Sequence, residues 1–115
     1  MARRALRIEM LVPTIGEGGM EVLIVRMVRA FSAAGHDVGV TCTESTGPRG
    51  DALLREGYRV TVVPTLGRTT LLWPAALERS LRQRAPDVAH IHNGVWLKGA
   101  RAARRAGVPV VVHTC

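Results

Sequence analysis

The chain has 115 residues, 47% of them hydrophobic, which is enough for one domain with a buried core but includes no apolar run long enough to cross a bilayer. Its formal charge of +7 suits anionic lipid or phosphorylated ligands and equally suits ordinary solvated helix faces. Nucleic-acid binding is not expected, because the four aromatic residues form no stacking series.

Strand and helix patterns alternate along the chain. A continuous apolar strand enters a glycine-rich turn, Gly16 to Gly19, which opens into an amphipathic helix that Gly35 ends. Pro86 and Asp87 separate the third helix from the fourth strand, and the last helix stops at Gly107. In chain order we predict, to within about two residues, strand 6–13, helix 20–34, strand 37–42, a loop to residue 50, helix 50–56, strand 59–63, helix 71–85, strand 88–91, helix 95–106 and strand 109–114.

Short connections between alternating strands and helices predict a parallel sheet with helices on both faces. We therefore expect one α/β domain over 1–115, a doubly wound Rossmann-like sheet in the order 3-2-1-4-5. Ligands of such sheets bind beyond the carboxyl ends of the strands, where the strand order reverses. Here that point lies between the first and fourth strands.

The glycine turn predicts an anion site. A helix start offers unpaired N–H groups and partial positive charge, and glycines let a phosphate approach the backbone. Gly16, Gly18 and Gly19 do not complete the dinucleotide fingerprint, because Glu21 stands where its last glycine belongs. The alternative is a turn that only reverses the chain.

Polar residues follow the fourth and fifth strands at the same edge. His92 and Asn93 are candidates to bind a sugar hydroxyl or phosphate, although local hydrogen bonding to the loop is an equal reading for His92. His90 shares its strand face and is expected to be structural. No third ligand accompanies the two histidines, so no metal is expected. His113 lies near the end of the fifth strand.

Other polar residues carry weaker signals. Glu9 lies within the first strand and has no facing carboxylate, so it is given no acid–base role. Glu44 follows the second strand, where dinucleotide folds place a ribose-binding acid, but a solvated loop is the favoured reading of this residue. Cys42 and Cys115 have no metal-ligand spacing and predict buried free thiols in a reducing cytoplasm. Arg3 and Arg4 lead directly into a strand, so no secretory signal is expected.

The helix pattern over 71–85 combines an apolar stripe with Arg79, Arg82 and Arg84. Such a helix can lie on an anionic membrane surface. The other reading is that its stripe is core and its arginines are solvated.

Four segments occur in the order found in the N-terminal domain of family-4 glycosyltransferases, which have the GT-B fold, and together they resemble that domain. They are Gly-Gly-Met-Glu-Val at 18–22, Phe-Ser-Ala-Ala-Gly-His-Asp-Val at 31–38, Pro-Asp-Val-Ala-His-Ile-His at 86–92 and Gly-Val-Pro-Val-Val-Val-His-Thr at 107–114. The resemblance implies a retaining, metal-independent transfer from a nucleotide-sugar donor, with no cofactor. It places Gly18 and Gly19 at the donor diphosphate, and His113 is the nearest match to the family's histidine beside the transferred sugar.

The resemblance further implies that this is the acceptor-side half of a larger enzyme. The family's C-terminal domain, with its pair of glutamates, has no counterpart here, so the chain alone is expected to be inactive. The acceptor would be a sugar, a lipid-linked sugar or a small molecule, and the protein would be cytoplasmic, with peripheral contact at the inner membrane face. Two rivals are a Rossmann-type dinucleotide-dependent oxidoreductase and a non-enzymatic module that binds anions or membranes.

Overall fold

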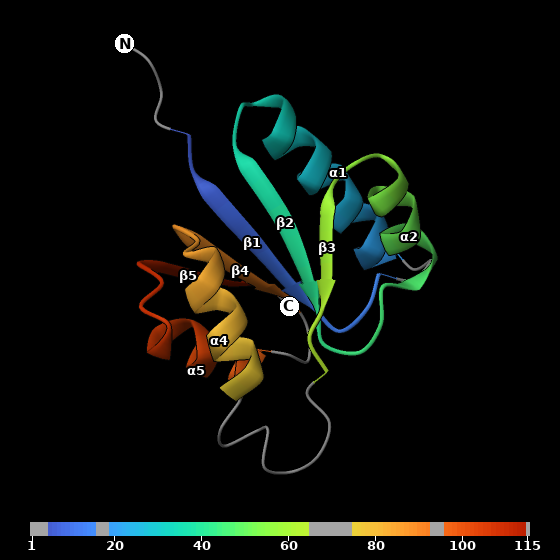
Figure 1. The fold of residues 1–115 in the computed structure, drawn as a ribbon. Helices are drawn as coiled ribbons and strands as arrows, with labels where there is room; N and C mark the ends of the chain where they lie inside the picture. Colours follow the sequence, from blue (N-terminus) through green and yellow to red (C-terminus); the bar gives the residue numbers. More distant parts are fainter. Residues whose placement is uncertain (1–4, 16–18, 65–74, 93–95, 115) are drawn as a thin grey trace.

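The computed structural model describes residues 5–15, 19–64, 75–92 and 96–114, and all structural statements below concern these residues. They form a single sheet with helices on both sides (Figure 1). In chain order the elements are β1 (Arg7–Val12), α1 (Gly19–Ala33), β2 (Asp37–Cys42), α2 (Gly47–Arg55), β3 (Arg59–Val62), α4 (Ala75–Arg84), β4 (Val88–His92), α5 (Trp96–Arg105) and β5 (Val110–Thr114).

The sheet confirms the predicted topology. Its strand order is β3-β2-β1-β4-β5, and every neighbouring pair is parallel. Strands β1 and β4 pair directly, from Ile8 opposite Val88 to Leu11 opposite Ile91. The order of the strands therefore reverses between β1 and β4, as a doubly wound fold requires.

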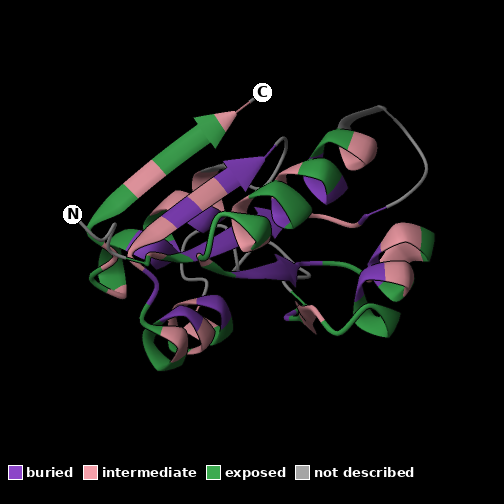
Figure 2. Ribbon diagram, turned by 90° about the horizontal axis from the view of Figure 1, so that it is seen from above, coloured by how far each residue is buried: buried purple, intermediate pink, exposed green. Residues whose placement is uncertain are grey.

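The core has two layers because β1 is buried on both faces. On one face Met10 and Val12 pack with residues of α1 and α2, such as Val28 and Leu53. On the other face Leu11 packs with residues of α4 and α5. Figure 2 shows the contrast with β5 at one margin of the sheet, where most residues are exposed. The continuous apolar run of the first strand is thus explained by double burial.

The apolar stripe of α4 belongs to the core. Leu77 and Leu81 are fully buried, whereas Arg79 and Arg82 are exposed. For residues 75–84 the structure therefore confirms the reading in which the apolar stripe is core and the arginines are solvated. The first part of the predicted helix lies outside the described residues. An apolar helix face that inserts into a membrane is not available on α4.

One predicted boundary is wrong. Helix α2 begins at Gly47, whereas the sequence pattern predicted a loop as far as residue 50. The glycine–proline pair reads as a helix breaker, but Pro48 lies in the first turn, where a missing backbone N–H costs nothing and the fixed φ suits the helix. The other described boundaries differ from prediction by at most one residue, apart from the start of α4, because residues 71–74 lie outside the described part of the chain.

Three helices end in the same hydrogen-bonded motif. After α1, Gly35 has φ of 95°, its N–H donates to the Ser32 carbonyl, and the N–H of His36 donates to Phe31. The same pair of bonds follows α2 at Gly57 and α5 at Gly107. This left-handed cap confirms the predicted helix ends, because glycine adopts positive φ without steric cost.

A buried carboxylate lies in the middle of the sheet. Glu9 on β1 is fully buried, accepts a hydrogen bond from Thr41 Oγ1 at 2.6 Å, and pairs with Arg59 Nη2 at 2.5 Å. Glu9, Gly39 and Arg59 occupy one row across β1, β2 and β3. A Cβ atom at Gly39 would lie 2.2 Å from Arg59 Nη2, so only glycine lets the guanidinium cross β2 to reach Glu9.

Burial also explains the described cysteine. Cys42 at the end of β2 is a buried free thiol, as predicted. Burial, together with the nearby Glu9 carboxylate, raises the pKa of this thiol to about 12, so it is a neutral core residue. Cys115 lies outside the described residues.

The row across three strands predicts that Gly39→Ala is strongly destabilising. The added methyl group displaces the Arg59 guanidinium and leaves the Glu9 carboxylate buried without its cation. We expect the free energy of unfolding, measured in urea, to fall by about 3 kcal/mol or more. In a Glu9→Met background, which has no buried charge to strand, the same substitution is expected to cost much less. Equal costs in both backgrounds would show that the ion pair is not the reason for glycine.

Candidate functional site

The predicted site lies at the carboxyl edge of the sheet. Strand β1 ends at Val12 and helix α1 begins at Gly19, while β4 ends at His92 beside Thr114 of β5. Because β1 and β4 are neighbours, the head of α1 and the end of β4 both lie at the edge where the strand order reverses. Gly16, Gly18 and Asn93, which were predicted to take part, lie outside the described residues.

His92 is the most unusual polar residue of this edge. Its side chain is fully buried, and neither ring nitrogen has a hydrogen-bond partner among the residues that the structure describes. Burial lowers the pKa of His92 to about 4, with further lowering from the charges of His90 and His113. The imidazole is therefore neutral near pH 7, with one nitrogen carrying a proton and the other a lone pair.

The neighbouring histidines occupy different environments. The rings of His90 and His92 lie 4.1 Å apart between centroids, tilted by 35°. His90 is half-buried, and its Nε2 is 2.7 Å from the Thr114 hydroxyl. Burial lowers its pKa as well. His113 stands opposite Ile91 on the exposed strand β5, close enough to influence His92. By this register His113 shares the face of Ile91, whereas His90 and His92 are on the other face of the sheet, so only His90 and His92 lie side by side.

Sequence reasoning missed two further polar residues at this edge. The Thr43 hydroxyl, just beyond β2, is buried and has no hydrogen-bond partner. The Nε of Arg49, in the first turn of α2, is likewise buried without an acceptor. Neither residue belongs to a recognisable motif, and only the parallel pairing of β1 with β2 brings Thr43 to the predicted edge. By contrast, Glu44 is exposed, and no contact of its side chain supports ribose binding.

Buried polar atoms without partners are rare, because each costs about 1–3 kcal/mol. Of the five such side-chain atoms in the described structure, the two of His92 and those of Thr43 and Arg49 lie at the carboxyl edge.

The described part of the chain contains no group of three or more His, Cys, Asp or Glu side chains placed to hold a metal. It also contains no helix with the length and apolar character of a membrane span.

The lowered pKa of His92 predicts a pH dependence of stability. In the unfolded chain the imidazole titrates near 6.5, whereas in the folded chain its pKa is about 4, so the unfolded chain binds the proton more readily. The contribution of the neutral His92 imidazole to the free energy of unfolding is fully present above pH 6.5. It is lost as the pH falls toward 4. Relative to His92→Leu, the native chain should lose about 3 kcal/mol of unfolding free energy over this interval. Urea unfolding at several pH values measures it, and parallel curves for the two proteins would contradict it.

The sequence of this chain is similar to those of known proteins. Residues 17–115 match Glycosyltransferase Family 4. Over 84 residues, 68% of this chain, the sequence is 38% identical to an Escherichia coli protein named UDP-Gal:alpha-D-GlcNAc-diphosphoundecaprenol alpha-1,3-galactosyltransferase. The matched region is 21% of that protein, so the chain spans about a fifth of its relative's length.

Solved structures support the fold alone. Two crystal structures of the C-terminal domain of a Pyrococcus furiosus hydrogenase superpose with TM-scores of 0.61 and 0.60. They cover 100% and 99% of this chain and 96% and 95% of their own, at 14% and 12% identity. At such identities the likeness confirms an α/β domain of this kind and carries nothing about chemistry.

Proposed function

This chain belongs to glycosyltransferase family 4, and we propose that it forms the acceptor-side Rossmann-like domain of a retaining GT-B enzyme that moves a sugar from a nucleotide-sugar donor to an acceptor hydroxyl. The observation that carries the proposal is the neutral His92, buried at the carboxyl end of β4, with both ring nitrogens unpaired among the described residues. An imidazole in this state can donate to one hydroxyl and accept from another, as recognition of a sugar requires.

The donor diphosphate is proposed to bind at the head of α1. This helix is 15 residues long, and its first N–H groups and partial positive charge favour an anion. Gly18 and Gly19 would let the diphosphate approach the backbone, and Arg49 in the first turn of α2 adds a guanidinium at the same edge. These groups would stabilise the negative charge that develops on the leaving diphosphate.

The acceptor is proposed to bind over the ends of β4 and β5. His92 and Asn93 would hold its hydroxyl groups, and His113 would lie beside the transferred sugar. His92 is covered in this structure, so a hydroxyl must displace what covers it, and the gain is a partner for each unpaired nitrogen. Catalysis would come from holding the acceptor hydroxyl against the donor sugar, without a metal or cofactor.

A lipid-linked acceptor is the class we favour. The Escherichia coli relative is named for a diphosphoundecaprenol-linked substrate. In this chain the basic residues gather on one side, because α4 carries three and α5 four, against one acidic residue, Glu78. Helices α1 and α2 together carry four basic and two acidic residues. We infer that the α4–α5 side faces an anionic membrane, at the cytoplasmic leaflet, and holds the domain near its lipid substrate by charge alone.

Titration of UDP-galactose into the isotope-labelled chain tests the donor site. We expect saturable shifts of the amides at the head of α1 and no response to NADH, since the dinucleotide fingerprint is incomplete. No sugar transfer is expected from the chain alone, because the proposal assigns the rest of the donor site to a second domain. Tight NADH binding would favour an oxidoreductase, and measurable transfer would refute the division of the site.

Substitution of His92 tests the acceptor site. Removal of both ring nitrogens in His92→Leu should weaken binding of a GlcNAc-diphospholipid analogue about 10-fold, the worth of a hydrogen bond to a buried group. The matched variant His92→Gln keeps one donor and one acceptor and should retain most of the affinity. If leucine and glutamine behave alike, His92 does not contact the acceptor.

Vesicle binding tests the membrane face. Each basic residue near an anionic surface contributes about 1 kcal/mol, so Arg101→Gln with Arg104→Gln should weaken binding to phosphatidylserine vesicles about 25-fold. The control pair, Arg26→Gln with Arg55→Gln, removes the same charge from exposed positions of α1 and α2 and should change little. An equal loss in both pairs would mean that net charge, and not the α4–α5 side, attracts the membrane.

A further inference from the structure

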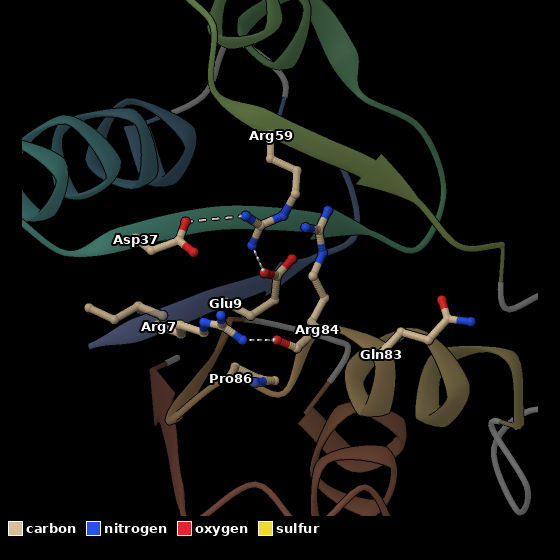
Figure 3. Close-up of a pocket in the computed structure, with 8 residues that line it drawn as sticks. Arg7, Glu9, Asp37, Arg59, Gln83, Arg84 and Pro86 are labelled. Atoms are coloured by element: carbon tan, nitrogen blue, oxygen red, sulfur yellow. Dashed lines mark hydrogen bonds and ion pairs between the residues drawn. The ribbon is translucent and has the colours of Figure 1, made fainter. Parts of the chain in front are cut away.

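A polar pocket lies at the edge of the sheet opposite the candidate site, where the strands begin. Its volume is about 210 Å³, several times the roughly 30 Å³ that a water molecule takes up in the liquid. Figure 3 shows its charged walls, which come from the starts of β1, β2 and β3 and from the end of α4. They are Arg7, Glu9, Asp37, Arg59 and Arg84. Three residues of β1, Met10 to Val12, at roughly 3.3 Å each, separate this pocket from the carboxyl end of the strand.

The carboxylates of this pocket are already compensated. Arg59 pairs with Glu9 at 2.5 Å and with Asp37 at 3.3 Å, and Thr41 donates a further hydrogen bond to Glu9. The Glu9 oxygens are fully buried, so they present no free negative charge to a ligand. The Nε of Arg59, however, is buried and has no acceptor in the described part of the chain.

Two guanidinium groups of the pocket lack an anionic partner within the described structure. Arg84 Nη2 donates only to the neutral Thr61 hydroxyl, at 3.2 Å. Arg7 Nη1 donates to the backbone carbonyl of Arg84, at 3.3 Å. In Figure 3 the side chain of Arg84 extends from α4 toward the Arg59 guanidinium. Burial and the positive charge of Arg59 lower the pKa of Arg84, and the nearby carboxylates of Glu9 and Asp37 offset part of this lowering.

We propose that this pocket binds a phosphate group between Arg7, Arg59 and Arg84. A tetrahedral oxyanion accepts several guanidinium N–H bonds at once, and arginine forks match its geometry. It would neutralise the surplus charge of three arginines over two carboxylates and give the Arg59 Nε an acceptor. The site is independent of the proposed transfer reaction, since none of its residues belongs to the carboxyl edge.

Titration of inorganic phosphate into the isotope-labelled chain, at ionic strength held constant with chloride, tests this proposal. We expect saturable amide shifts at Arg7, Asp37 and Arg59. Arg84→Gln should weaken the affinity for phosphate about 10-fold or more. Arg84→Lys should weaken it by less, because lysine keeps the positive charge but cannot form the paired guanidinium hydrogen bonds. The control Arg79→Gln, at an exposed position of the same helix, should leave the affinity unchanged.

Two further arms separate the possible outcomes. Glucose 1-phosphate in place of inorganic phosphate shows whether the group is taken as a monoester or as the free ion. UDP binding reports on the head of α1 and is expected not to change in Arg84→Gln. The proposal for one site can therefore be refuted without refuting the proposal for the other. The proposal is overturned if phosphate produces no saturable shift at the amino edge, or if Arg84→Gln and Arg79→Gln bind it equally.

Discussion

Burial of a charge in the central strand constrains the whole sheet. A carboxylate removed from water is tolerated only when it is paired and hydrogen-bonded. Glu9 meets this condition through Thr41 on β2 and Arg59 on β3, so a single side chain ties together three strands that are far apart in sequence. The pairing also requires a residue without a side chain at Gly39, which lies between them. A shift of either register by one residue would turn Glu9 or Arg59 to the other face.

The fold could be predicted because its signals are local and repeated. Apolar runs, helical spacing and glycines after helices fix the elements, and the rule of right-handed crossovers leaves few ways to order five parallel strands. The row of Glu9, Gly39 and Arg59 could not be predicted in this way. Within β1, Glu9 is only a polar interruption, and its partner lies 50 residues away on a non-neighbouring strand. The start of α2 was missed because glycine and proline signal a turn and a first helical turn equally.

The sequence predicts where the candidate site lies in the fold, but not the chemical state of its residues. Parallel strands have their carboxyl ends at one edge, so the presence of the α1 head and His92 at the same edge follows from strand order alone. Whether the imidazole is charged depends on how deeply it is buried and on its neighbours His90 and His113, which no spacing in the sequence reveals. The unpaired hydroxyl of Thr43 is a similar case, since threonine after a strand is ordinary until its surroundings are known.

The exposed strand β5 affects how this domain behaves in solution. Val110 and Val112 are 49% and 41% exposed, and the strand forms one margin of the described sheet. A margin of this kind, rich in β-branched residues and without charged side chains, is a template on which another extended segment can pair. In the isolated chain, such pairing between copies would compete with the folded monomer at high protein concentration. A lysine at position 112 would introduce the charge with which natural sheets discourage it.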